Sequence, residues 1–264
     1  MRSLEERAPE NSGAGIDPSL VACLLAARSV VIMTGAGASA ESGIPTFRDA
    51  MTGLWSRYSP EKLASPAGFA EDPALVWNWY AWRRDIVAAA EPNRGHKAIG
   101  EMQSILPDCT LVTQNVDGLH QRAGSKAVIE LHGNLFENIC SEDGQPVEPA
   151  AWIPGEPPLC PRCGSPVRPG VVWFGEMLPE NALTSARIAA AECDVFFSVG
   201  TSSLVYPAAE LAELALRAGA VIVEINPAPT PLTGLADHAI AEPSASALPR
   251  ICQALGQSRK GVTK

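Results

Sequence analysis

Short runs of apolar residues recur along the chain, and small or polar residues follow most of them. The runs that we predict as strands cover residues 30–33, 110–113, 128–131, 194–199, 220–225 and 237–241. Segments with helical composition lie around and between them, at residues 18–27, 183–191, 207–218 and 248–255, and proline-interrupted helices fill residues 50–107. Strands that alternate with helices are typical of a parallel sheet covered on both faces. We therefore expect an α/β fold with a Rossmann-like, doubly wound parallel sheet.

The ends of the predicted strands carry the candidate chemistry. In open parallel sheets, ligands bind outside the carboxyl ends of the strands. Five strand ends bring small and polar residues to that edge: Gly35-Ala36-Gly37, Gln114-Asn115, His132-Gly133, Gly200-Thr201-Ser202 and Asn226-Pro227. Chance turns would supply glycine and asparagine, but not a histidine together with Gln-Asn-Val-Asp. The pattern predicts a nucleotide site at this edge.

The first of these turns departs from the fingerprint of hydride-transferring enzymes. Gly35 and Gly37 lack the Cβ atoms that would hold a phosphate away from the backbone, and a short helix could begin near Gly37. The sixth place of G-x-G-x-x-G is Ala40, however, and no acidic residue stands about 20 positions further on. A polar loop at residues 45–49 follows instead. The turn indicates a nucleotide that is used in an unusual way.

Composition divides the chain into a large discontinuous domain and two inserted modules. We assign residues 17–49, 93–135 and 171–257 to the nucleotide-binding domain. Residues 50–92 form a helical module that contains the aromatic stretch 77–82, and residues 136–170 form a cysteine-bearing module rich in proline and glycine. Residues 1–16, which are polar, are predicted as a disordered tail, and residues 258–264 as a second tail.

Charge and cysteine content narrow the class of protein. The 264 residues carry a net charge of −9, which argues against nucleic acid as a partner. No apolar segment is long enough to span a bilayer, and the start lacks a signal peptide. Seven cysteines, an odd number, do not suggest a disulfide framework, and Cys23, Cys193 and Cys252 are expected in the core. We expect a cytoplasmic protein that does not bind membranes, and nothing in the sequence defines its oligomeric state.

Taken together, the motifs resemble those of the sirtuin family. The similarity runs in order from about residue 20 to residue 255 and covers Gly35 to Arg48, Thr113-Gln114-Asn115-Val116-Asp117, His132-Gly133, Val172-Trp173-Phe174-Gly175-Glu176, Gly200-Thr201-Ser202 and Asn226-Pro227. Tyr80 and Arg83 match the Tyr-x-x-Arg of the class III branch, whose members act on acidic acyl groups as well as acetyl. The resemblance implies NAD-dependent removal of acyl groups from protein lysines, which yields nicotinamide and O-acyl-ADP-ribose.

The resemblance also implies roles for individual residues. Histidine titrates near neutral pH, so His132 suits the base that acts at the ribose hydroxyls, although a lone histidine at a strand end is more often structural. Asn115 would orient the ribose or a water, and Val116 and Asp117 would hold the nicotinamide carboxamide. Phe47 would shield the reactive ribose. The remaining expected NAD contacts are Gly35, Ala36, Gly37, Ser39, Thr46, Arg48 and Gln114 around the ribose and phosphates, and Gly200, Thr201, Ser202, Asn226, Pro227 and Ser244 on the adenosine half.

The substrate is expected to enter as an added strand beside residues 171–175. Val172, Phe174 and Gly175 would then contact the acyl-lysine peptide through backbone hydrogen bonds. At the acyl end, Arg83 could pair with a carboxylate and Tyr80 could donate a hydrogen bond to it, as a succinyl or malonyl group requires. The alternative is that both side chains only pack within an aromatic helix.

The cysteine-bearing module holds an incomplete zinc pattern. Cys160 and Cys163 form a Cys-x-x-Cys pair, but the first pair reads Cys140-Ser141-Glu142-Asp143, with aspartate in place of the second cysteine. Three thiolates with Asp143 or water could bind zinc, or the metal could be lost and the module held by packing. Both alternatives stay open.

Other functions compete with acidic deacylation. They are deacetylation without acidic preference, mono-ADP-ribosyl transfer, and a non-catalytic module that binds NAD or ADP-ribose. An NAD oxidoreductase is disfavoured by the missing third glycine and ribose-binding acid.

Overall fold

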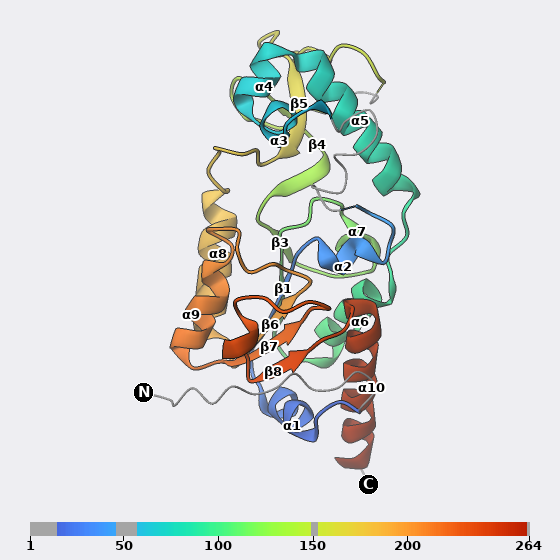
Figure 1. The fold of residues 1–264 in the computed structure, drawn as a ribbon, viewed down its shortest axis with the longest axis vertical. Coiled ribbons are helices and arrows are strands. Elements are labelled where there is room, and N and C mark those ends of the chain that lie inside the picture. The colour runs from blue at the N-terminus through green and yellow to red at the C-terminus, as the bar shows by residue number, and fades with distance from the viewer. Residues whose placement is uncertain (1–14, 46–56, 149–152, 263–264) are drawn as a thin grey trace.

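The computed structural model describes residues 15–45, 57–148 and 153–262, and it consists of a large lobe built on a parallel sheet and a small lobe at one end (Figure 1). The sheet has six strands, all parallel, in the order β3-β2-β1-β6-β7-β8. This confirms the predicted α/β fold. The strands are β1 (Val30–Thr34), β2 (Cys109–Thr113), β3 (Val128–Glu130), β6 (Val195–Val199), β7 (Val221–Ile225) and β8 (His238–Ile240).

Helices cover both faces of the sheet and build part of the small lobe. They are α1 (Pro18–Ala26), α2 (Gly37–Ala40), α3 (Pro60–Leu63), α4 (Pro66–Glu71), α5 (Pro73–Ala89), α6 (Arg94–Ile105), α7 (Leu119–Arg122), α8 (Glu180–Glu192), α9 (Glu210–Ala218) and α10 (Ser244–Val262), with a 3-10 turn at Thr233–Leu235. Within the described residues, no helix has the length and hydropathy to cross a membrane.

Strand β1 lies at the centre of the sheet, and its side chains alternate between two cores. Val30 and Ile32 pack against α1, α6 and α10, whereas Val31 and Met33 pack against α8 and α9. Because both faces are covered, every residue of β1 is buried, which explains its continuous apolar run.

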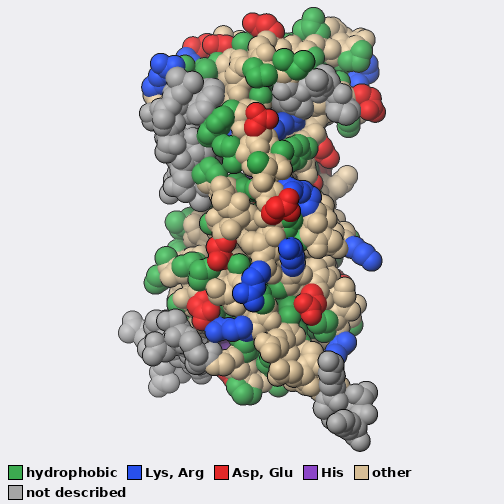
Figure 2. Space-filling model, turned by 90° about the vertical axis from the view of Figure 1, so that its right-hand side faces the viewer, with side chains coloured by type: hydrophobic (Ala, Val, Ile, Leu, Met, Phe, Trp, Pro, Cys, Tyr) green, Lys and Arg blue, Asp and Glu red, His purple; other side chains and the backbone are tan. Residues whose placement is uncertain are grey.

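On the face turned toward the viewer in Figure 2, basic and acidic side chains are interspersed.

The small lobe contains an antiparallel strand pair that the sequence did not predict. Strand β4 (Gly133–Cys140) pairs with β5 (Val167–Val171), and both cross the limits that we assigned to the cysteine-bearing module. Helix α5 is fixed to this pair by the buried Arg84. Its guanidinium donates hydrogen bonds to the carbonyl groups of Leu135 and Glu137.

Several element limits differ from the predictions. Helix α10 begins at Ser244 rather than Leu248 and continues through residues 258–262, so the prediction of a tail there is wrong for these residues. Helix α9 begins at Glu210, because residues 207–209 form a turn whose Pro207 carbonyl accepts the Glu210 N–H at 3.1 Å. Cys193 and Cys252 are buried as expected, but Cys23 is only half-buried on α1.

Two strand-end loops touch each other at the carboxyl edge of the sheet. The Gly37 N–H donates to the Gly200 carbonyl at 2.9 Å. A Cβ on Gly37 would lie 2.8 Å from that oxygen, and one on Gly200 would lie 2.4 Å from the backbone nitrogen of Ala38. These glycines are therefore required by contact between the loops, a reason that the sequence pattern alone did not reveal.

We expect Gly200→Ala to destabilise the protein strongly. Gly200 has a φ of +60°, so the new methyl group would combine backbone strain with a clash against Ala38. The expected loss is at least about 2 kcal/mol of unfolding free energy, measured by denaturant titration. Gly256→Ala is the matched control, because a Cβ there, in α10, meets open space and should stabilise the helix by about 0.5–1 kcal/mol. Equal stability of Gly200→Ala and the wild type would contradict this account.

Candidate active site

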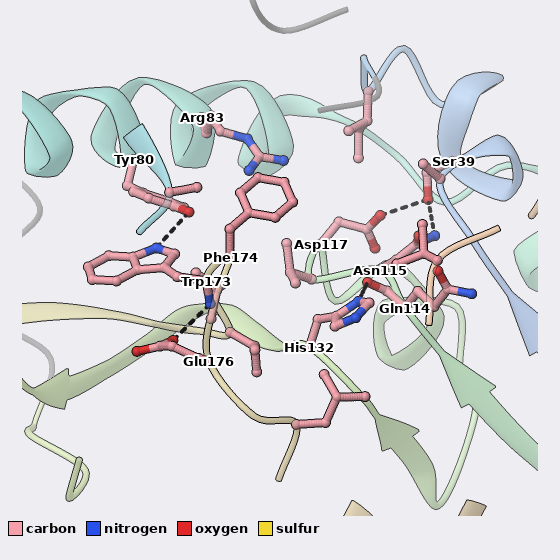
Figure 3. Close-up of a pocket in the computed structure, with 18 of the residues that line it drawn as sticks. Ser39, Tyr80, Arg83, Gln114, Asn115, Asp117, His132, Trp173, Phe174 and Glu176 are labelled. Atoms are coloured by element: carbon pink, nitrogen blue, oxygen red, sulfur yellow. Dashed lines mark hydrogen bonds between the residues drawn. The ribbon is translucent and has the colours of Figure 1, made fainter. Parts of the chain in front are cut away.

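A cavity of about 420 Å³ lies between the carboxyl edge of the sheet and the small lobe (Figure 3). The β1 loop contributes Ala36 and Ser39, and the β2 loop contributes residues 114–117. His132 enters from the junction of β3 and β4, and Tyr80 and Arg83 enter from α5. Residues 172–176 line one side, and residues 205–207 also reach the cavity. Three of the five predicted strand ends, at Ala36, Gln114-Asn115 and His132, therefore converge on this cavity.

A buried hydrogen-bond network fixes the polar residues at one end of the cavity. The Ser39 hydroxyl donates to Asp117 Oδ2 at 2.7 Å and accepts from Asn115 Nδ2 at 3.1 Å. Asn115 Nδ2 also donates to the Gly35 carbonyl at 3.0 Å. Both amide hydrogens of Asn115 are thus directed to protein acceptors, which leaves its Oδ1 as the atom able to accept a hydrogen bond from a ligand.

Two further histidines lie next to this network, and the sequence analysis missed them. His96 Nδ1 accepts the Asn93 N–H at 3.3 Å, and its Nε2 lies 3.3 Å from the Ser39 hydroxyl. His120 Nε2 lies 2.9 Å from the Thr34 hydroxyl. Burial lowers the pKa of His96, and burial together with the neighbouring His96 lowers the pKa of His120 to about 3, so both rings are neutral. Three of the four histidines of the chain lie near this end of the cavity. Because histidine is rare in this chain, each one could have been considered as a candidate site residue.

His132 is held in one orientation by a backbone group. Its Nδ1 donates to the Gln114 carbonyl at 2.9 Å, which places the other ring nitrogen, Nε2, as the acceptor. Burial lowers the pKa of His132 from its ordinary value of 6.5, so the ring is neutral at neutral pH. Figure 3 shows the ring beside Gln114 and Asn115. The side chain is thereby prepared to accept a proton through Nε2.

An aromatic cluster closes the opposite end of the cavity. Tyr80 and Trp173 are buried, and the Trp173 Nε1 donates a hydrogen bond to the Tyr80 hydroxyl at 2.9 Å. The guanidinium of Arg83 lies 5.0 Å from the ring centre of Trp79 and 5.9 Å from that of Tyr80. Burial lowers the pKa of Arg83, and the nearby Tyr80 and Asp117 partly oppose the shift. Arginine keeps its charge in this setting, so the cavity has a cationic group at this end.

The segment that joins β5 to α8 is fixed by an ion pair. Arg168 donates to both carboxylate oxygens of Glu176, at 2.6 and 2.7 Å, and its guanidinium lies 3.6 Å from the centre of the Trp173 ring. Glu176 Oε2 also accepts the Trp173 N–H at 2.8 Å. Residues 172–176 are therefore held rigidly along the cavity wall.

Most of the predicted cofactor and substrate residues line this cavity, but the adenosine set does not. The predicted residues that line it are Ala36, Ser39, Tyr80, Arg83, Gln114, Asn115, Val116, Asp117, His132, Val172, Phe174 and Gly175. Gly200 contacts the β1 loop, and a Cβ on Gly95 of α6 would lie 3.0 Å from the hydroxyl of the buried Ser244. Thr46, Phe47 and Arg48 fall outside the described residues.

The cavity wall also contains residues that were not predicted from the sequence. Val205, Tyr206 and Pro207 line it, and Leu204, Val205 and Tyr206 expose large apolar or aromatic side chains to solvent. The signal in the sequence was the apolar run Leu204 to Tyr206 shortly after Gly200-Thr201-Ser202. Apolar groups on a surface often mark a binding site.

The three cysteines of the small lobe converge, and Asp143 lies next to Cys140 without being part of the cluster. The sulfur atoms of Cys140, Cys160 and Cys163 all lie within 4.8 Å of one another. The Asp143 carboxylate instead accepts hydrogen bonds from Arg162 at 3.2 and 3.4 Å and from the Gln145 N–H at 2.9 Å. Three thiolates fit the preference of zinc for sulfur, with the fourth position left to water or a displaced Asp143.

Comparisons with known proteins agree with this geometry. The Sir2 family model matches residues 35–207. A Methylococcus capsulatus protein described as an NAD-dependent protein deacylase is 52% identical over 248 residues, which is 91% of this chain and 97% of that protein. NAD-dependent protein deacylase 1 of Pseudomonas aeruginosa is 52% identical over 241 residues, covering 88% of this chain and 96% of its own length. The crystal structure of a Sir2 homologue in complex with NAD matches with a TM-score of 0.88 at 43% identity, over 95% of this chain and 98% of that one.

The chain therefore belongs to the Sir2 family. At this identity over nearly its whole length, it is an NAD-dependent protein deacylase. The predictions of a sirtuin and of an NAD-dependent enzyme are confirmed.

We expect the purified protein to carry zinc on its three cysteines, at about one equivalent per chain by elemental analysis. Asp143→Cys should slow the loss of zinc to a chelator, because it would add a fourth thiolate to the site. Asp143→Ala is the control, since it removes the pair with Arg162 without adding a ligand. Absence of zinc from the wild-type protein would contradict the prediction, as would an unchanged release rate for Asp143→Cys.

Proposed function

We propose that this deacylase removes acidic acyl groups, such as succinyl and malonyl, from protein lysines in addition to acetyl. The observation that carries the proposal is the charged Arg83 beside the Tyr80 hydroxyl at one end of the cavity (Figure 3). A carboxylate at the end of an acyl chain would meet a cation there in a largely desolvated site, where a charge-assisted hydrogen bond is strong. Burial raises the pKa of Tyr80 to about 12, so its phenol remains a hydrogen-bond donor.

His132 is proposed as the general base. Its Nδ1–H is used by the Gln114 carbonyl, so Nε2 accepts the proton from a ribose hydroxyl. The lowered pKa keeps the ring in the basic form at neutral pH. Asn115 is proposed to orient the ribose or a water through Oδ1, because its amide hydrogens are already bound by Gly35 and Ser39.

NAD supplies the ADP-ribosyl group that accepts the acyl chain once nicotinamide has left. Val116 and Asp117 are proposed to hold the nicotinamide carboxamide, and Ser39 to contact the ribose. For the adenosine half, the proposed contacts are Gly200, Thr201, Ser202, Asn226, Pro227 and Ser244. The match to a Sir2 homologue in complex with NAD supports this arrangement.

The acyl-lysine peptide is proposed to lie between residues 172–175 and the exposed apolar residues Leu204 to Tyr206. The N–H groups of Val172 and Phe174 already donate to the carbonyls of His132 and Ala64, both at 2.9 Å. The Glu176 N–H likewise donates to the Trp173 carbonyl at 3.0 Å. A substrate strand would therefore pair through the carbonyl groups of Val172 and Phe174 and the N–H of Gly175. A similar structure, Sir2 bound to acetylated peptide, has a TM-score of 0.78 at 31% identity and supports a peptide-binding role.

Deacetylation without acidic preference is the second candidate. It is favoured by the position of Arg83 over the Trp79 ring, because this contact would stabilise the packing of the two side chains whether or not a carboxylate binds. In that case Arg83 would only help to shape the cavity and would not bind a carboxylate.

We expect Arg83→Met to reduce kcat/KM for a succinyl-lysine peptide by about 30- to 100-fold, because a desolvated charge-assisted interaction is lost. Activity on the acetyl-lysine form of the same peptide should change by less than about threefold, since an acetyl group has no charge to pair. Both rates are measured by nicotinamide release at saturating NAD. An unchanged ratio of succinyl to acetyl activity in Arg83→Met would overturn the acidic preference.

The role of His132 predicts a specific pH profile. Because its pKa lies below 6.5, kcat/KM should stay level above that pH and fall as protonation removes the Nε2 lone pair at lower pH. His132→Gln should lose about 100-fold or more in kcat/KM, with NAD binding retained by calorimetry. His238→Gln, beside Asp17 and away from the cavity, is the control and should keep the wild-type profile. A His132→Gln variant that remained active with the same acidic limb would exclude His132 as the base.

A further inference from the structure

The Tyr80 hydroxyl is constrained by a partner that can only donate. An indole N–H has no acceptor capacity, so the 2.9 Å contact from Trp173 Nε1 occupies a lone pair of the Tyr80 oxygen. A phenolic hydrogen lies near the ring plane and has two favoured directions. With one of them blocked by the indole N–H, the Tyr80 hydrogen must take the other. The indole, together with Arg83, whose guanidinium also interacts with the Tyr80 hydroxyl, thus restricts where Tyr80 can donate.

Trp173 is itself held so that this N–H cannot swing away. The Arg168 guanidinium lies 3.6 Å from the centre of its ring on one side, and the ring of Phe69 lies 5.3 Å away at a tilt of 45°. Its backbone N–H is bound by Glu176, which in turn is bound by Arg168 through two hydrogen bonds. Only 3% of Trp173 and 2% of Tyr80 is exposed, so water does not compete for the contact.

We infer that Trp173 is a specificity-determining residue: its indole N–H orients the Tyr80 hydroxyl so that the phenolic hydrogen faces the acyl end of the cavity. A phenylalanine at position 173 would fill much of the same space but leave the hydroxyl free to rotate. The inference deepens the proposed function and rests on the acidic preference argued above. Trp173 acts through Tyr80 and is therefore a positioning residue rather than a catalytic one.

Two features of the site explain why the orientation matters for acidic acyl groups. A carboxylate is an acceptor only, so it gains from a hydroxyl that presents hydrogen and loses when the same hydroxyl presents a lone pair. An acetyl group ends in a methyl group and makes no such distinction. The loss of Trp173 should therefore reduce succinyl activity more than acetyl activity.

The test compares Trp173→Phe with the wild type on succinyl- and acetyl-lysine forms of one peptide at saturating NAD. We expect KM for the succinyl peptide to rise about three- to tenfold more than KM for the acetyl peptide, as for loss of one net hydrogen bond. Trp77→Phe is the matched control, since it removes an indole N–H bond to the Ile153 carbonyl from the same helix as Tyr80 but outside the cavity. It should leave both activities unchanged.

A double-mutant cycle separates orientation from simple packing. In a Tyr80→Phe background there is no hydroxyl to orient, so Trp173→Phe should cause no further loss of succinyl preference. Additive losses would show that Trp173 acts through cavity shape and would overturn the inference. An unchanged succinyl KM in Trp173→Phe, combined with a lost preference in Arg83→Met, would overturn the role of Trp173 alone. An unchanged preference in Arg83→Met would instead overturn the acidic preference on which it rests.

If Trp173→Phe folds poorly, the inference stays testable with 3-benzothienylalanine at position 173. This side chain keeps the shape of the indole and replaces its N–H with sulfur. The same rise in succinyl KM is expected, and wild-type kinetics with this side chain would overturn the inference.

Discussion

The contact between the β1 loop and Gly200 is the constraint on which the site depends. The two loops approach so closely that neither Gly37 nor Gly200 can carry a Cβ without displacing backbone atoms. This approach sets the position of Ser39, two residues after Gly37, and thereby the network through Asn115 and Asp117. A steric limit between backbones thus determines the placement of the polar atoms that we propose as ligand contacts.

The cavity built on this constraint has two chemically different ends. At one end, neutral histidines and hydroxyl groups surround Ser39 and Asn115, and neighbouring protein groups fix the directions of the Asn115 amide hydrogens and the Ser39 hydroxyl. At the other end, Arg83 supplies positive charge among aromatic rings. His132 lies between them. One end suits the neutral and hydroxyl groups of a sugar, and the other suits the variable end of an acyl chain, so a single cavity can bring both to one base.

Local pattern predicted the parts of this protein that local physics determines. The buried strands, the turn at Gly35 and the convergence of strand ends follow from periodicity and from the geometry of parallel sheets. The β4–β5 pair did not, because Pro169 and Gly170 lie within β5 and obscure a strand pattern. The Trp173–Tyr80 hydrogen bond joins residues 93 positions apart, and Asp143 pairs with Arg162 while also lying next to Cys140. Such pairings depend on tertiary packing, and the spacing of residues along a single sequence does not predict which distant side chains meet.

The central position of β1 has a consequence for how the protein is made. Strand β1, Val30 to Thr34, pairs on one side with β2 and on the other side with β6. Strand β6 begins only at Val195, far along the chain. During synthesis on a ribosome, the N-terminal part of the chain must wait with one edge of its central strand uncovered until β6 emerges. The apolar side chains of β1 are exposed for that interval, and exposed apolar side chains beside an unpaired strand edge favour aggregation until β6 has paired.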